Sequence, residues 1–84
     1  MGTPEIILNA LAERTRFRLL IEIGKGPVCA CFLPKIIRRT QPAVSQHLKS
    51  LLNAGLVQVR KTGAKRIYAI SGKGKKVLGD VRKW

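Results

Sequence analysis

Acidic residues are scarce in this sequence. Glu5, Glu13, Glu22 and Asp80 face 17 lysines and arginines, so the 84-residue chain has a formal net charge of +13. His47 is the single histidine, carboxylates do not occur in pairs at a useful spacing, and the thiols have no neighbouring base. A glycine-rich phosphate loop is also missing. These absences argue against an enzyme.

Long hydrophobic runs are missing as well. No apolar stretch approaches the ~20 residues that a membrane-spanning helix requires, and no signal-peptide pattern opens the chain. No basic amphipathic helix carries a bulky aromatic face, which disfavours a role on a membrane surface. We therefore expect a cytoplasmic protein without a membrane partner. A chain of this length has room for one small core, so residues 1–84 are expected to form one domain.

The positive charge is concentrated near the end of the chain. Residues 60–83 contain nine basic residues and one acid. A basic surplus favours binding to a polyanion, because each neutralised phosphate releases a counterion. Solubility in a salty or hot cytosol is the alternative explanation. The uneven distribution favours nucleic acid.

Residues 40–57 contain the most informative pattern, a capped amphipathic helix closed by Gly55. Thr40 can cap its start, and Pro42 is tolerated in the first turn. The apolar stripe consists of Val44, Leu48, Leu51 and Leu52. The opposite face and its flanks consist of Gln46, Lys49, Ser50, Asn53, Ser45 and His47. Amides, hydroxyls and lysine are groups that reach base edges and phosphates, so this face suits a DNA-reading helix.

Three further helices are predicted before it, over residues 4–12, 15–23 and 31–39. Their expected inward residues are Ile7, Leu8 and Leu11, then Phe17, Leu20 and Ile21, then Leu33, Ile36 and Ile37. The third helix leads into residues 40–53 with almost no linker. This arrangement predicts a helix-turn-helix whose second helix enters the major groove.

After Gly55 the apolar period changes from helical to alternating. Residues 57–59 and 66–70 alternate, and the loop between them, residues 61–65, contains a glycine. We predict a two-stranded hairpin, or wing, with basic residues at its tip. Ser71 can cap a last helix over residues 73–84. The expected fold is mostly α with a two-stranded β wing, a winged helix-turn-helix.

Four segments resemble the ArsR/SmtB family of winged-helix transcriptional repressors. They are LAERTRFRLL at 11–20, VCAC at 28–31, QPAVSQHL at 41–48 and AGLV at 54–57. The resemblance covers roughly residues 5–70. It implies a homodimer that binds a partly palindromic operator in double-stranded DNA and releases it when an inducer binds.

The expected DNA contacts come from the second helix and the wing. They are Gln41, Ser45, Gln46, His47 and Lys49, with Arg60, Lys61, Lys65 and Arg66. For His47, packing at the helix flank is the alternative to a phosphate or base contact. A solvated helix face is the favoured explanation for Arg18, whereas the roles of Arg14 and Arg16 stay open. The expected dimer interface consists of Ile7, Leu11, Val77, Leu78, Val81 and Trp84. The competing function is a general architectural or chromatin DNA-binding protein without an inducer.

Cys29 and Cys31 are the candidate inducer site. Positions i and i+2 lie roughly 6.6 Å apart in a strand, whereas a disulfide brings the Cβ atoms to about 4 Å, so an internal bond is expected to be strained. Three interpretations stay open: buried packing, a soft metal or metalloid site, and an intersubunit disulfide switch. The arsenical sensors of the family have an acid where Phe32 stands, and a further downstream cysteine that this chain lacks. DNA binding itself should require no cofactor.

Overall fold

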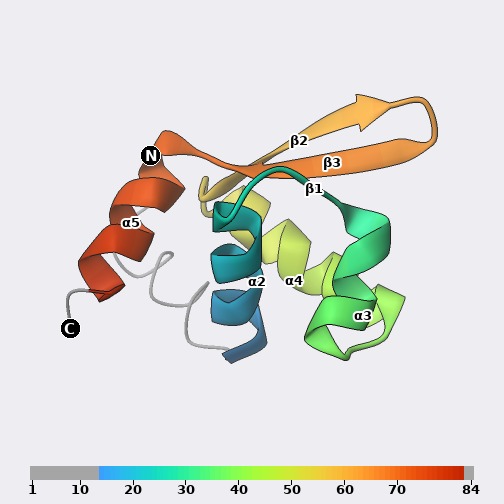
Figure 1. Cartoon of the computed structure of the whole chain (residues 1–84), viewed down its shortest axis with the longest axis horizontal. Coiled ribbons are helices and arrows are strands. Elements are labelled where there is room, and N and C mark those ends of the chain that lie inside the picture. Colours follow the sequence, from blue (N-terminus) through green and yellow to red (C-terminus); the bar gives the residue numbers. More distant parts are fainter. Residues whose placement is uncertain (1–13, 83–84) are drawn as a thin grey trace.

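The computed structural model describes residues 14–82. Figure 1 shows a group of helices with a hairpin across one side, and α3 and α5 at opposite ends. The elements are α2 (Arg14–Gly24), β1 (Val28–Cys29), the 3-10 turn η1 (Ala30–Phe32), α3 (Leu33–Ile37), α4 (Gln41–Asn53), β2 (Val57–Thr62), β3 (Lys65–Ile70) and α5 (Gly72–Arg82). The helix expected over residues 4–12 lies outside the described residues.

Helix α4 begins and ends where the sequence predicts. The backbone N–H of Ala43 donates to Oγ1 of Thr40 at 3.4 Å, which caps the first turn. At the other end Gly55 adopts a φ of 75°, a left-handed conformation that favours glycine. The amides of Gly55 and Leu56 then bond back to the carbonyls of Leu52 and Leu51. These reversed bonds satisfy carbonyls that the helix leaves unpaired.

Helix α3 is shorter than the predicted helix over residues 31–39. Residues 30–32 form the turn η1, and Pro34 stands in the first turn of α3. Arg38 ends the helix in a left-handed conformation with a φ of 61°. Leu33 and Ile37 are buried as predicted, but Ile36 is 43% exposed, which corrects its inward assignment. A five-residue helix presents only one narrow stripe to the core, and the i, i+4 pair occupies it.

The wing contains one strand more than the two-stranded prediction. In residues 14–82 the antiparallel sheet has the order β1-β3-β2, and β1 pairs Val28 with Tyr68 and Cys29 with Ile67. A two-residue strand is too short to show an alternating pattern, so the sequence did not reveal it. The hairpin reversal is also tighter than the predicted loop, because Thr62 already pairs with Lys65.

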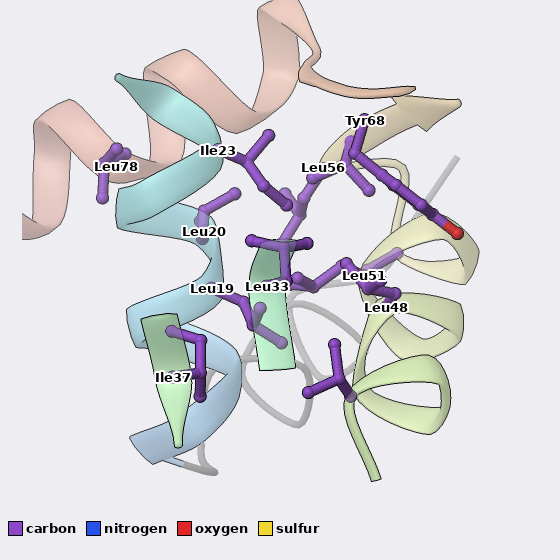
Figure 2. Packing of buried hydrophobic residues seen from close by; sticks show 13 residues of the cluster. Leu19, Leu20, Ile23, Leu33, Ile37, Leu48, Leu51, Leu56, Tyr68 and Leu78 are labelled. Atoms are coloured by element: carbon purple, nitrogen blue, oxygen red, sulfur yellow. The ribbon is translucent and has the colours of Figure 1, made fainter. Parts of the chain in front are cut away.

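The core lies between α2, α3, α4 and the sheet, and α5 closes one end. Figure 2 shows side chains from α2 pointing toward those of α3, α4 and the following turn. The largest fully buried side chains are Leu19, Leu20, Ile23, Leu33, Ile37, Leu51, Leu56 and Val44. Phe17 and Ile21, expected inward, are only half-buried. The inner stripe of α2 instead runs through Leu19 and Ile23, a rotation of its buried face.

Helix α5 is tied to the end of α4 through Ser71. Its Oγ accepts from the N–H of Gly74 at 2.9 Å, the predicted cap, and donates to the carbonyl of Gly55 at 2.7 Å. The N–H of Ser71 also donates to the carbonyl of Leu56 at 3.1 Å. Within residues 14–82, no helix has the length and apolar character needed to cross a membrane.

Candidate nucleic-acid interface

The outer face of α4 is polar and exposed. Ser45, Gln46 and Lys49 are exposed, while Val44 and Leu48, from the same two turns, are each 2% exposed. Burial of the apolar stripe fixes the rotation of the helix about its axis. The amide, hydroxyl and ammonium groups are therefore held outward by the core rather than by contacts of their own.

His47 lies at the flank of this face and is half-buried. The Nε of Arg16, on α2, donates to Nδ1 of His47 at 3.1 Å. This bond joins positions 31 residues apart and ties α4 to α2. The sequence alone did not assign a role to Arg16. The feature that pointed to this residue is the Thr-Arg pair within the segment that carries the family resemblance.

The wing carries the expected basic residues, and all of them are exposed: Arg60, Lys61, Lys65 and Arg66. Lys61 stands directly opposite Arg66 in the β2–β3 ladder. Like charges at opposed positions destabilise a sheet, and the sequence has no carboxylate between Glu22 and Asp80 to offset them. This cluster is therefore available to an external polyanion.

A cleft of about 340 Å³ brings α4 and the base of the wing together. One side is formed by α4, and the other by the η1 turn and β3. The lining residues are Ala30, Gln41, Ser45, Leu48, Lys49, Leu52, Arg66 and Tyr68. Residues from the two predicted DNA-contact groups thus share one surface. Ala30 and Tyr68 also line this cleft, although the sequence pattern did not mark either as a site residue.

Cys29 and Cys31 are much closer than an extended or helical backbone would place them. Cys29 is the last residue of β1 and the cap of η1, so the chain turns between the two thiols. Their Sγ atoms are 2.6 Å apart, and both cysteines are free. The expectation that an i, i+2 spacing keeps these side chains apart is wrong here, because it assumed a regular strand or helix.

The thiol pair is electrostatically asymmetric. The hydrogen bond from Cys31 lowers the pKa of the Cys29 thiol, and the backbone N–H of Cys31 and the positive charge of Lys65 act in the same direction. The same side-chain bond raises the pKa of Cys31. The pair lines a second cleft, of about 350 Å³, with Gln41, Lys65 and Arg66.

A metal is not fully coordinated by these thiols alone. In residues 14–82 there is no group of three or more His, Cys, Asp or Glu side chains that could hold a metal ion. Two thiolates fall short of the four ligands of a tetrahedral zinc site. A soft ion at this place would need ligands from outside the single chain.

The predicted dimer residues are only partly described. Val77 is half-buried on α5, and Leu78 is 6% exposed, so Leu78 belongs mainly to the core of the single chain. The side chain of Val81, and residues Ile7, Leu11 and Trp84 as a whole, lie outside the described part of the structure.

Comparison with known proteins identifies the family. The model described as "Bacterial regulatory protein, arsR family" matches residues 13–59. The arsenical resistance operon repressor of Staphylococcus xylosus is 37% identical over 65 residues, which cover 77% of this chain and 62% of that protein. An HTH-type transcriptional regulator of Mycobacterium tuberculosis is 36% identical over 72 residues, covering 86% of this chain and 67% of that one.

Solved structures agree with the fold. HlyU from Vibrio cholerae has a TM-score of 0.83 at 26% identity, covering 93% of this chain and 86% of that one. A homodimeric winged helix-turn-helix DNA-binding domain from Mycobacterium bovis has a TM-score of 0.85 at 23% identity, covering 93% and 73%. The chain spans about half to three-fifths of the length of the first curated relatives that it matches. It belongs to the arsR family of bacterial regulatory proteins, regulators rather than enzymes as its sequence predicts, and has the winged helix-turn-helix fold.

Proposed function

We propose that this chain is a sequence-specific DNA-binding transcriptional repressor that acts as a homodimer on a partly palindromic operator. One observation carries the proposal. The exposed polar face of α4, through Gln41, Ser45 and Lys49, and the basic wing, through Arg66, line a single cleft. A convex helix beside a positively charged hairpin is the arrangement that reads a major groove while holding the adjacent backbone.

The two parts of this surface have different roles. Ser45 and Gln46 project from the first turns of α4 and read base edges, because an amide can bond a base bidentately. Gln41, His47 and Lys49 stand around them and contact phosphates or flanking bases. The wing residues Arg60, Lys61, Lys65 and Arg66 hold phosphates or the minor groove and supply affinity rather than sequence preference.

The proposal of a homodimer rests on the small number of base pairs that one chain can contact. A single α4 reads only a few base pairs, and two copies related by a twofold axis would read half-sites one helical turn, about 34 Å, apart. The M. bovis neighbour is described as homodimeric. We assign the interface to α5 and to the segment predicted from the sequence to be helical over residues 4–12, with Ile7, Leu11, Val77, Val81 and Trp84 as its apolar residues.

Release of DNA is assigned to the thiol pair. Cys29 and Cys31 line a cleft whose other residues include Gln41, at the start of α4, and Lys65 and Arg66 of the wing. A thiol-binding metal or metalloid, or oxidation of the thiols, would act within reach of both parts of the DNA surface. Several relatives are named for arsenical resistance, which supports a soft inducer. The coordination would be completed by a partner subunit or an external thiol.

The function is tested by selecting bound sequences from a random DNA pool. A repressor should enrich a partly palindromic site and keep a large preference for it over random DNA at elevated salt. Gln46→Ala should weaken operator binding by ~1–3 kcal/mol and relax the preference at one base pair of each half-site. Equal weakening on operator and random DNA would remove Gln46 from base readout. Enrichment of no sequence would favour the architectural alternative.

The inducer is tested on the same operator. Binding is measured with arsenite, zinc, cadmium or a mild oxidant, for the unmodified protein and for the double variant Cys29→Ser, Cys31→Ser. A coupling of ~1–3 kcal/mol between ligand and DNA is expected in the unmodified protein alone. An equal response of both proteins would make the thiol pair structural.

A further inference from the structure

The hydrogen bond between Arg16 and His47 connects α2, a core helix, to the edge of the exposed face of α4. Arg16 lies on α2, which contributes to the core, and His47 lies at the flank of α4's outward face. The bond runs from Nε of Arg16 to Nδ1 of His47 over 3.1 Å. Both residues are half-buried, so water competes with this bond less than on an open surface.

The direction of the bond determines the form of the imidazole ring. A guanidinium carries N–H donors and no acceptor, and it stays charged in proteins. Nδ1 of His47 must therefore accept, and it cannot carry a proton while the bond exists. In the neutral ring the remaining proton is on Nε2, so that nitrogen becomes the donor.

We infer that Arg16 is a positioning residue for DNA recognition, which holds His47 as the Nε2–H tautomer so that it donates one hydrogen bond to the operator. This inference rests on the proposed function. The acceptor is an oxygen or nitrogen atom of the DNA, either a phosphate oxygen or a major-groove acceptor such as N7 of a purine. Without Arg16 the ring can populate the other tautomer, which presents an acceptor in the same place and is repelled by either DNA atom.

The tautomer itself is measured by NMR on the full chain, through long-range proton–nitrogen correlations of the single imidazole. The unmodified protein should show Nδ1 without a proton and Nε2 with one. Arg16→Met removes the donor but keeps much of the aliphatic stem, and it should give a mixture of tautomers. The matched control is Arg18→Met, which removes the same charge from an exposed position on α2 and should leave the ring unchanged. An Nδ1-protonated ring in the unmodified protein, or the same tautomer in Arg16→Met, overturns the inference.

The effect on DNA is measured as a double-mutant cycle with the selected operator sequence. Arg16→Met should weaken binding roughly three- to tenfold more than Arg18→Met, the size of one ordinary hydrogen bond. In a His47→Ala background that excess should vanish, because Arg16 acts through the ring. Persistence of the full excess in this background would assign Arg16 a direct contact or a purely structural role instead.

A conservative variant of Arg16 and two modified operators distinguish the remaining explanations. Arg16→Lys keeps a donor and the charge, so it should retain the tautomer and most of the affinity. If Arg16→Met fails to fold, an Nδ1-protonated ring in the unmodified protein would still overturn the inference. Operators with a neutral methylphosphonate, or with 7-deazapurine, identify the acceptor, since the penalty of His47→Ala should disappear on only one of them. Failure of the random-pool selection would refute the proposed function, whereas intact specificity with equal Arg16 and Arg18 variants would refute only this inference.

Discussion

At Cys29 and Cys31 the local path of the backbone determines whether the two thiols can interact. In a regular strand these two positions would lie roughly 6.6 Å apart, and in a helix their side chains would diverge, but the strand-to-turn junction brings their sulfur atoms within 2.6 Å. One thiol then stabilises the ionised form of the other. The pair acts as one titrating unit, in which Cys29 ionises before Cys31.

This asymmetry predicts opposite shifts in two single variants. Cys31→Ala removes the leading cause of the lowered pKa of Cys29, so the pKa of Cys29 should rise toward its ordinary value. Cys29→Ala removes the leading cause that raises the pKa of Cys31, so that pKa should fall. Thiolate absorbance in the ultraviolet, followed against pH, measures each remaining thiol. The assignment is wrong if neither remaining thiol shifts from its position in the unmodified protein, or if both thiols shift in the same direction.

Single residues whose chemistry is local could be read from the sequence. Thr40 and Ser71 were predicted as caps and both accept the expected backbone bonds. Residues whose role depends on distant neighbours could not be read in this way. The partner of His47 is 31 positions away, and the exposure of Ile36 depends on how short α3 is.

Among the elements, the long ones were predictable and the short ones were not. Helix α4 has 13 residues, enough turns for its apolar stripe and caps to agree. Strand β1 has two residues and α3 has five, so tertiary contacts rather than periodicity define them. The polar face of α4 and the basic wing were therefore predictable as separate groups. Their meeting in one cleft depends on the core that orients them.

The start of α5 depends on a glycine at position 74. A Cβ built there would meet the carbonyl oxygen of Leu56 and the side chain of Ile70, and backbone on one side cannot move away cheaply. Gly74→Ala should therefore lower the free energy of unfolding by about 1–3 kcal/mol, as overpacking does. Denaturant unfolding measures the change.

Gly79 provides the matched control on the same helix. A Cβ at this position meets nothing within 4 Å, so alanine should gain only the helix propensity difference, up to about 1 kcal/mol of stabilisation. Equal effects of Gly74→Ala and Gly79→Ala would show that α5 does not pack against the turn after α4 in this way.

For the whole molecule, charge placement predicts the salt dependence of DNA binding. Replacing both Lys61 and Lys65 with alanine should reduce the slope of log K against log salt by about 0.9 for each phosphate that the wing no longer neutralises. Lys75→Ala with Lys76→Ala removes the same charge from exposed positions on α5 and should change the slope less. Identical slopes for the two double variants would remove the wing from the interface.

Assembly is the second property at this scale. Changing Val81 and Trp84 to aspartate should give monomers that bind the operator far more weakly, since two half-sites would no longer be held together. Sedimentation of the unmodified and altered chains at micromolar concentration measures this. Lys75→Glu, which alters charge at an exposed position of α5, is the control and should leave the assembly intact. A monomeric unmodified protein would refute the proposed dimer.

The hydroxyl of Ser71 gives the molecule a stiff joint. It accepts from the first turn of α5 and donates to the carbonyl of Gly55, at the end of α4. With the amide of Ser71 donating to the carbonyl of Leu56, two hydrogen bonds join the start of α5 to the residues that follow α4, and the third caps α5 itself. We therefore expect a rotation of α5 to move α4 with it, because the connection between them is held by hydrogen bonds and is not a flexible loop. In the proposed homodimer, the distance between the two α4 helices would then depend on how the two α5 helices pack at the interface.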